Sequence, residues 1–273
     1  MSIAIVTGGA SGIGRAIATS LVRRGDTVVV ADINADGARQ VADRLNTLGQ
    51  GKATAAALDV TDAAAVDALY RSVKDEHGRL DLVFNNAGIA IGGLAEELSL
   101  DHWNRAIDIN LKGVVHGVDS AYRIMLEQGF GHIVNTASLA GLVPMPVGIP
   151  YTATKHAVVG LSLGLRAEAA PRGVKVSVVC PSFVDTPLLA NVNPDLPATA
   201  MSGDAKNEIK KASPRLYTAE KLARDIVRGV DRNKALIVAP AHGRVAWRGV
   251  RLNPAGAVRV AQFAVSRIQS GRK

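Results

Sequence analysis

The sequence predicts a single-domain α/β protein built on a doubly wound parallel sheet. Short apolar runs rich in β-branched residues alternate with longer amphipathic stretches, and no linker, internal repeat or low-complexity tract divides the chain. Apolar strands bounded by helices are typical of a parallel sheet that is covered on both faces and connected by right-handed crossovers. A chain of 273 residues, of which 48% are hydrophobic, is long enough to bury a large core.

The elements follow one another in a regular order. Seven runs have the composition of buried strands, at 3–7, 27–32, 53–60, 81–86, 132–138, 175–181 and 235–239. Amphipathic segments predict helices near 13–24, 35–48, 62–77, 101–128, 151–170 and 218–232. Residues 182–217 break the rhythm, since they are rich in Pro, Asn and Ser. A stretch of that length without periodicity is usually functional, so we expect a substrate-loop lid there.

The distribution of charge separates a body from a tail. The net charge is +8, but seven of the 32 basic residues and no acidic residue lie in 240–273. Residues 1–239 therefore hold 25 basic against 24 acidic residues, which disfavours a nucleic-acid-binding core. We expect a dehydrogenase-sized domain over 1–239 and a basic C-terminal extension over 240–273.

The composition also gives an expectation for the cellular location of the protein. The single cysteine, Cys180, permits no intrachain disulfide, which suits a reducing, cytoplasmic location. The chain opens directly on a strand-like run, so no leader is expected, and no 18-residue apolar stretch predicts a membrane span. The six histidines form no HExxH pattern and have no cysteine partners, so we expect no metal site.

A glycine-rich turn, TGGASGIGRAIA at 7–18, follows the first strand. In an open α/β sheet this turn holds a dinucleotide pyrophosphate, and glycines let the backbone approach the phosphates. The following helix supplies free N–H groups for the anion. The spacing Gly8-x3-Gly12-x-Gly14 differs from the commoner GxGxxG. We expect a nicotinamide dinucleotide here.

The identity of that dinucleotide depends on Asp32 at the end of the second strand, 24 residues after Gly8. A carboxylate there accepts hydrogen bonds from the adenosine ribose and repels a 2′-phosphate. No Lys or Arg lies within 8–12 or at Ile33 and Asn34 to bind such a phosphate. NAD(H) is therefore favoured over NADP(H). The alternative is that Asp32 merely caps the next helix.

A second motif is YTATK, with Tyr151 and Lys155 one helical turn apart. An adjacent ammonium favours the phenolate and lowers the pKa of a tyrosine, which suits an acid/base catalyst. Taken alone, the same spacing also fits a surface tyrosine beside a solvated lysine.

Together these motifs resemble the short-chain dehydrogenase/reductase family, a group of single-domain Rossmann-fold oxidoreductases, over about 3–239. TGGASGIG resembles the family's cofactor turn, LDV (58–60) its adenine-contacting segment, and NNAG (85–88) the motif after the fourth strand. CPSFVDTP resembles the turn after the sixth strand, except that Ser182 stands where the family usually has glycine. The resemblance implies a cofactor site formed by Gly8, Ser11, Gly12, Ile13, Gly14, Asp32, Ile33, Asp59, Val60, Asn86, Ala87, Gly88, Tyr151, Lys155, Pro181, Val184 and Thr186.

The resemblance also implies a catalytic tetrad of Asn110, Ser138, Tyr151 and Lys155. Tyr151 would be the acid/base, and Lys155 would lower its pKa and bind the nicotinamide ribose. Ser138 would hydrogen-bond the substrate oxygen, and Asn110 would hold a water that links Lys155 to solvent. Each has a simpler alternative, such as a turn residue for Ser138 or a polar break in a long helix for Asn110.

The expected reaction is hydride transfer between the nicotinamide cofactor and a hydrophobic secondary alcohol or ketone. Apolar residues at the start of the lid and at 143–149 suggest this substrate class. The alternatives are a dinucleotide-binding regulatory protein that keeps the fold without the chemistry, and a scaffold or nucleic-acid-binding protein that uses the basic tail.

Two further expectations concern association. The helices at 101–128 and 151–170 carry apolar residues beyond what one sheet face should cover, which favours a homodimer or homotetramer; these are Val114, Val115, Val118, Val158, Val159, Leu161 and Leu165. In 255–269 an apolar helical stripe predicts docking on the body or on a neighbouring subunit, with contact to an anionic membrane as the alternative; it comprises Ala257, Val260, Ala261, Ala264, Val265 and Ile268.

Overall fold

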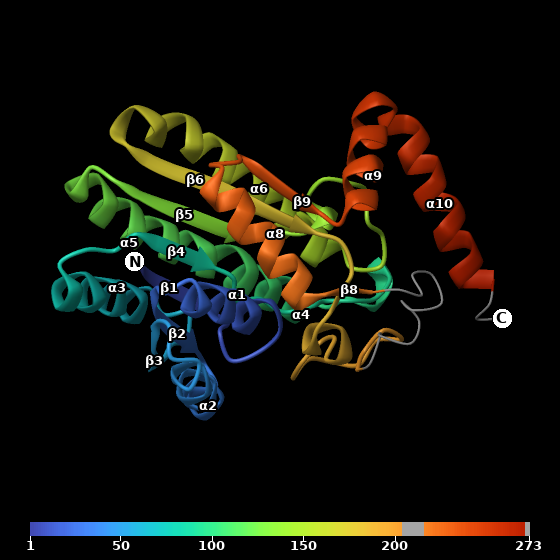
Figure 1. Cartoon of the computed structure of the whole chain (residues 1–273). Helices are drawn as coiled ribbons and strands as arrows, with labels where there is room; N and C mark the ends of the chain where they lie inside the picture. Colours follow the sequence, from blue (N-terminus) through green and yellow to red (C-terminus); the bar gives the residue numbers. More distant parts are fainter. Residues whose placement is uncertain (204–215, 271–273) are drawn as a thin grey trace.

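The computed structural model describes residues 1–203 and 216–270 and has a seven-stranded parallel sheet at its centre (Figure 1). The strand order is β3-β2-β1-β4-β5-β6-β9. The strands are β1 (Ile3–Thr7), β2 (Thr27–Asp32), β3 (Lys52–Ala57), β4 (Leu82–Asn85), β5 (Gly131–Thr136), β6 (Val174–Pro181) and β9 (Leu236–Ala239). The order reverses between β1 and β4, which confirms the doubly wound fold class.

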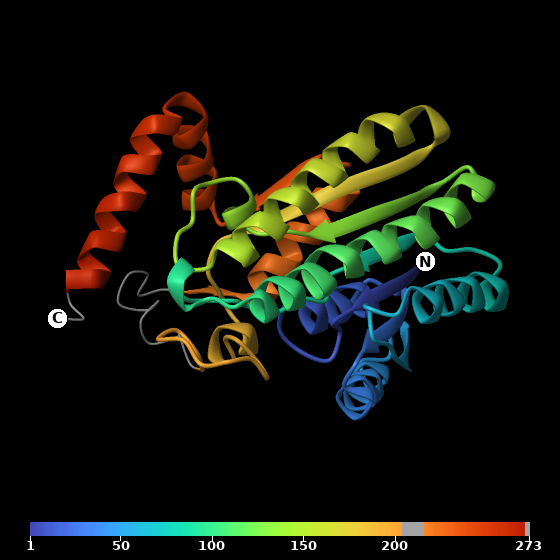
Figure 2. The ribbon, with the colours of Figure 1, turned by 180° about the vertical axis from the view of Figure 1, so that it is seen from behind.

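Helices cover both faces of this sheet (Figures 1 and 2). They are α1 (Gly12–Arg23), α2 (Ala35–Asn46), α3 (Ala63–His77), α4 (Leu100–Ala106), α5 (Gly113–Gln128), α6 (Ile149–Ala169), α8 (Ala219–Asp231), α9 (Ala241–Leu252) and α10 (Pro254–Ser270). The predicted strands and helices are all present, with boundaries that shift by a few residues. The helix predicted over 101–128 contains one irregularity, a π-helical turn at Ile107–Lys112 between α4 and α5.

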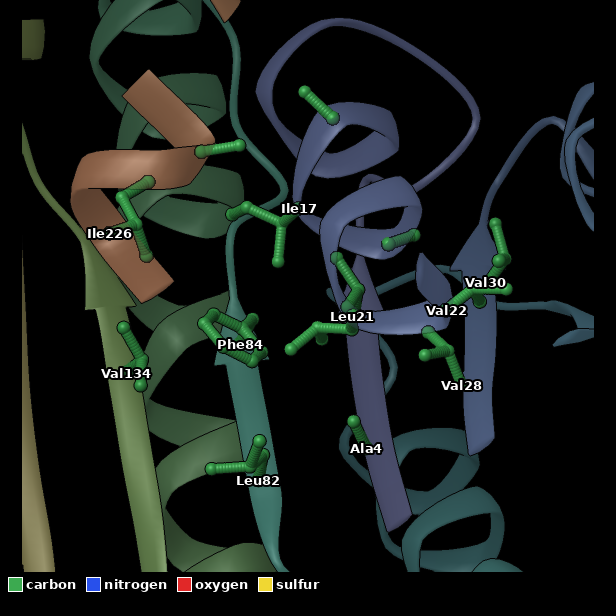
Figure 3. Close-up of a cluster of buried hydrophobic side chains, with 14 of the residues drawn as sticks. Ala4, Ile17, Leu21, Val22, Val28, Val30, Leu82, Phe84, Val134 and Ile226 are labelled. Carbon is green, nitrogen blue, oxygen red and sulfur yellow. The ribbon is translucent and has the colours of Figure 1, made fainter. Parts of the chain in front are cut away.

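The core lies on either side of the sheet. On one face, Ile17 and Leu21 of α1 and Ile226 of α8 pack over Phe84 and Val134, as Figure 3 shows. On the other face, α3, α5 and α6 bury a second group that includes the fully buried Tyr70, Ile124 and Ile133. Continuous apolar strands such as β1, all of whose residues are buried, are the reason for this two-sided packing.

A chain of polar side chains crosses the second face of the sheet. Tyr70 donates to Asn85 Oδ1 at 3.1 Å, and Asn85 donates to Asn135 Oδ1 at 2.8 Å. Asn135 in turn donates to Ser162 Oγ at 2.9 Å. These buried bonds join α3, β4, β5 and α6, and each of the four side chains has a hydrogen-bond partner, so their burial leaves no unpaired polar atom.

The described part of the predicted lid is irregular, as expected. It contains β7 (Val184–Asp185), which pairs in parallel with β8 (Tyr217–Thr218), and a short 3-10 turn at Pro187–Ala190. Residues 204–215 of the predicted lid lie outside the described residues.

The apolar surface expected on the long helices is smaller than predicted. Val114, Val158 and Val159 are buried against the sheet in a shared cluster. Val115 on α5 is 39% exposed and Leu163 on α6 is 37% exposed. Of the seven residues on which the prediction rested, three are buried, three are half-buried and only Val115 is exposed.

The C-terminal extension forms two helices at the β9 edge (Figures 1 and 2). α9 packs on the body through buried Gly243 and through Trp247, which contacts the cluster around Val238. α10 packs on α9, with the predicted stripe residues Ala257, Ala261 and Val265 half-buried.

Two further residues of that stripe border an open groove. Val260 is 71% exposed, and with Ala264 it lines an apolar groove of about 510 Å³ between α10, α9 and residues 143–146. The side chain of Ile268 and the residues Arg272 and Lys273 lie outside the described part of the chain. Among the described helices, none has both the length and the apolar character needed to cross a membrane.

Candidate active site

A cavity of about 770 Å³ opens at the carboxyl ends of the central strands, where the strand order reverses. This is the position at which open α/β sheets bind ligands. All but two of the predicted site residues line it, the exceptions being Gly14 and Asn110. Those two lie one layer behind, where they support the residues that form the wall.

The glycine-rich turn has the backbone shape that glycine allows. Gly8 and Gly12 have φ angles of +64° and +49°, in the left-handed region. A Cβ on Gly14 would lie 2.1 Å from the carbonyl oxygen of Gly8, so only glycine fits behind the turn. α1 begins at Gly12 with no acidic residue in its first turn, which leaves its N-terminus favourable for an anion.

Asp32 lies at the end of β2 beside this turn. Its Oδ2 accepts from Ala10 N at 3.0 Å and its Oδ1 from Asn34 N at 2.9 Å. The alternative role of Asp32 as a helix cap is not observed, because Asn34 is the N-cap of α2 and accepts from Gly37 N. The carboxylate thus joins the glycine-rich turn to the end of β2.

The LDV segment forms another part of the wall. Asp59 Oδ1 accepts from both the backbone N–H and the hydroxyl of Thr61, at 2.9 and 2.8 Å. These bonds lower the pKa of Asp59, and the positive charge of Arg105 contributes to the same direction. Val60 lies beside Asp59 in the cavity wall, and its carbonyl is within 2.9 Å of His116 Nδ1.

Tyr151 and Lys155 share one face of α6 at the inner end of the cavity. Lys155 Nζ lies 5.5 Å from the centre of the Tyr151 ring and donates to Thr136 O at 3.1 Å. Lys155 is only 4% exposed, so the simpler reading of a solvated surface lysine is wrong. Burial lowers the pKa of Lys155 to about 8.

Opposing effects act on the pKa of the Tyr151 phenol. Burial raises its pKa, and a hydrogen bond with Ser138 lowers it in part. We expected Lys155 to lower the pKa of Tyr151. The pKa is raised instead, because burial of the phenol has a larger effect than its hydrogen bond with Ser138. Ser138 begins the 3-10 turn Leu139–Gly141, where its hydroxyl accepts from Ala140 N at 3.2 Å.

Asn110 occupies the π-helical turn between α4 and α5. It is fully buried, and its carboxamide bonds both backbone groups of Ile89, at 2.9 and 3.0 Å. A Cβ built on Gly88 would lie 2.9 Å from Asn110 Oδ1 and 3.5 Å from Lys155 Nζ. The side chain of Asn110 therefore acts on backbone next to Lys155. An irregular helical turn of this type often lies at a functional site.

The turn after β6 closes the cavity. Ser182, which stands where the family usually has glycine, does not have a positive φ and donates its N–H to Ala239 O at 2.9 Å, so this backbone does not require glycine. Thr186 is 9% exposed, and a Cβ on Gly12 would lie 3.3 Å from its side chain. The lid therefore starts in contact with the glycine-rich turn.

Sequence reasoning did not identify several other wall residues. Arg105 reaches the cavity from α4, and Phe183 and Met201 reach it from the lid. Val147 has a φ of +61°, which is rare for a β-branched residue. Arg105 and Met201 lie in no motif, because their place in the wall depends on contacts between segments far apart in the chain, whereas Phe183 lies in the CPSFVDTP motif and Val147 in the apolar stretch 143–149.

Comparison with known proteins places this arrangement in a family. The family model for short chain dehydrogenase matches residues 2–197. An uncharacterized oxidoreductase of Staphylococcus aureus (strain MRSA252) is 40% identical over 192 residues, which span 70% of this chain and 82% of the relative.

Solved structures of short-chain dehydrogenases and reductases have a similar fold. A short chain dehydrogenase/reductase from Burkholderia phymatum in complex with NAD has a TM-score of 0.79 and 30% identity, covering 92% of this chain and 94% of that one. A 3-ketoacyl-(acyl-carrier-protein) reductase from Brucella melitensis complexed with NADH has a TM-score of 0.74 and 27% identity, covering 87% and 95%. With the family model matching most of its length, the chain belongs to the short-chain dehydrogenase/reductase family of oxidoreductases.

Proposed function

We propose that the protein transfers a hydride between NAD(H) and a hydrophobic secondary alcohol or ketone, with Tyr151 as the acid/base. The observation that carries the proposal is the convergence of Tyr151, Lys155 and Ser138 at the inner end of a cavity whose other end holds the glycine-rich turn and Asp32. The backbone of that turn fits a pyrophosphate, as the clash at Gly14 and the free start of α1 indicate.

NAD supplies the hydride acceptor when it is bound. The Asp32 carboxylate would accept hydrogen bonds from the ribose hydroxyls and would repel a 2′-phosphate. Asp59 and Val60 would contact the adenine, Thr186 the nicotinamide amide, and Lys155 the nicotinamide ribose. Two solved relatives hold NAD or NADH, which supports NAD over NADP.

The chemistry of the substrate end follows from the protonation of Tyr151. Because burial raises its pKa, the phenol is protonated near neutral pH and can donate to an alkoxide that forms from a ketone. Oxidation of an alcohol needs the phenolate, and a protonated Lys155 favours that form. Ser138 would stabilise charge on the substrate oxygen.

The wall beyond Tyr151 indicates the substrate class. It is almost entirely apolar, consisting of Ile89, Ala90, Ile91, Val143, Met145, Pro146, Val147, Leu188, Val192, Pro194 and Met201 with Asn191 and Asp195 at its rim. Such a wall favours an uncharged, hydrophobic alcohol or ketone.

We also propose that the protein is a cytoplasmic homo-oligomer. The single cysteine, which is buried, supports the location, and the exposed Val115 on α5 and Leu163 on α6 support the association of subunits.

The test is a turnover assay with 1-phenylethanol, 2-octanol and cyclohexanol, each with NAD and NADP side by side. Tyr151→Phe should abolish turnover while the Kd of NAD stays within a few-fold, and Tyr122→Phe, a change in the same residue type on α5, should leave both unchanged. Turnover retained by Tyr151→Phe would remove Tyr151 from the mechanism. NAD binding without turnover of any alcohol or ketone would favour the alternative of a regulatory protein.

A further inference from the structure

The backbone at 88–92, which leaves β4 and forms one wall of the cavity, is held by two asparagines in the same manner. The Asn110 carboxamide accepts from Ile89 N and donates to Ile89 O. The Asn193 carboxamide accepts from Gly92 N at 2.9 Å and donates to Gly92 O at 2.7 Å. Each side chain thus satisfies both backbone groups of one residue, and the two residues are three positions apart.

Asn193 belongs to the lid and is only 4% exposed. Its φ of +57° lies in the left-handed region, which asparagine tolerates better than most residues. Its Nδ2 also lies 2.9 Å from Thr199 Oγ1 and 3.1 Å from Ser202 Oγ. The side chain therefore joins three parts of the molecule: the 88–92 backbone, its own turn and the distal part of the lid.

Other contacts keep the same two segments together. Ala90 forms a parallel bridge with Val192, and Asn193 N donates to Ala90 O at 3.1 Å. Further out, His102 Nε2 lies 3.0 Å from Pro197 O, and Glu97 Oε1 accepts from Ala200 N at 3.3 Å. Ala90 and Val192 both line the cavity, so this joint forms part of its substrate end.

We propose that Asn193 is a positioning residue that locks the lid segment 191–203 to the 88–92 backbone and so holds Ile89 against Asn110. The link to the reacting groups is short, because a Cβ built on Gly88 would lie 2.9 Å from Asn110 Oδ1 and 3.5 Å from Lys155 Nζ, so both side chains lie beside the backbone next to Ile89. Loss of the Asn193 carboxamide should therefore loosen the substrate wall and the Asn110 contact, while the glycine-rich turn keeps its geometry.

The first test is hydrogen–deuterium exchange on the full-length protein, which needs no substrate. Asn193→Gly removes the side chain and keeps the left-handed backbone accessible. Its Gly92 amide should exchange at least tenfold faster. The Ile89 amide, which Asn193 does not touch, should also exchange several-fold faster, whereas β1 amides should not change. The matched control is Asn191→Gly, since Asn191 is the same residue type in the same segment and is exposed, whereas Asn193 is buried.

Faster exchange at Gly92 alone, with Ile89 unchanged, would overturn the proposal, because Asn193 would then be only a local tether. The same acceleration in Asn191→Gly would also overturn it. Asn193→Asp provides a graded variant, since a carboxylate can accept from Gly92 N but cannot donate to Gly92 O. In Asn193→Asp the Gly92 and Ile89 amides should exchange more slowly than in Asn193→Gly and faster than in the unaltered protein.

The second test is kinetic and rests on the proposed function. With NAD and 1-phenylethanol, Asn193→Gly should raise KM about tenfold or more, lower kcat less, and leave the Kd of NAD within about twofold. An equal loss of NAD affinity would indicate general destabilisation and would contradict the proposal. If the unaltered protein turns over none of the three alcohols of the assay above, the proposed substrate class is wrong, and the exchange at Ile89 still decides the role of Asn193.

Discussion

Lys155→Met should make the protein more stable and inactive. Lys155 is 4% exposed, and burial lowers its pKa from 10.5 to about 8. At neutral pH the folded protein must hold a buried positive charge, and this lowering of the pKa corresponds to a cost of about 3 kcal/mol of stability. Methionine has a similar shape without the charge, but it loses the hydrogen bond to Thr136 O, worth about 1 kcal/mol. The net gain at pH 7 should be about 2 kcal/mol.

The sign of the pH dependence follows from the direction of the shift. Because folded Lys155 binds its proton more weakly than the unfolded chain does, the wild-type free energy of unfolding rises between pH 8 and 10.5, as the charge is lost. The penalty should fall from about 3 kcal/mol at pH 7 to about 1 kcal/mol at pH 10. The advantage of Lys155→Met should therefore shrink to about zero at pH 10.

The assay is urea unfolding of both proteins at pH 7 and pH 10, followed by circular dichroism. Lys175→Met is the control, since Lys175 is exposed and its replacement should shift stability equally at both pH values. Turnover with NAD should be lost in Lys155→Met. A variant that is less stable than wild type at pH 7, or whose advantage is the same at both pH values, would refute the reasoning about the buried charge.

Three other predictions address the cofactor site and the tail. Asp32→Ala should narrow the preference for NAD over NADP, measured by titration of both; an unaltered protein that binds NADP more tightly would contradict the role of Asp32. Gly14→Ala, whose Cβ would lie 2.1 Å from Gly8 O, should weaken NAD binding more than tenfold, whereas Gly249→Ala, where nothing lies within 4 Å, should leave NAD binding unchanged. Deletion of 241–273 removes the packing of Trp247 and should lower the Tm or change the oligomeric state seen by light scattering, without altering sedimentation with anionic vesicles; loss of vesicle binding with an unchanged Tm would instead favour membrane contact.

The fold was predictable because its signals are local. Apolar runs such as 3–7 and 27–32 specify buried strands, and glycines at 8, 12 and 14 specify a turn that other residues cannot form. The position of Tyr151 and Lys155 on one face of a helix also followed from their spacing, although the burial of Lys155 and the direction of the Tyr151 pKa did not. That direction depends on how much water the rest of the structure removes.

The lid could not be predicted in the same way. Asn193 bonds Gly92 across 101 residues, and His102 meets Pro197 across 95. Neither pair carries a periodic pattern or a spacing rule, since the contact depends on two irregular segments. The π-helical turn at Ile107–Lys112 was missed for a related reason: its sequence has ordinary helical composition, and Asn110 takes its position through a bond to Ile89.

The segment 143–147 has a consequence for engineering. Val143, Pro144 and Pro146 form one wall of the active-site cavity and, with their other side, one wall of the apolar groove under α10. The segment ends at Val147, whose left-handed backbone leaves it little freedom to relax. A larger side chain at Ala261 or Ala264, on the opposite wall of this groove, would fill the space beside the segment without touching Tyr151 or Lys155. Substitutions on α10 can therefore be used to alter the packing of a segment that also lines the active-site cavity.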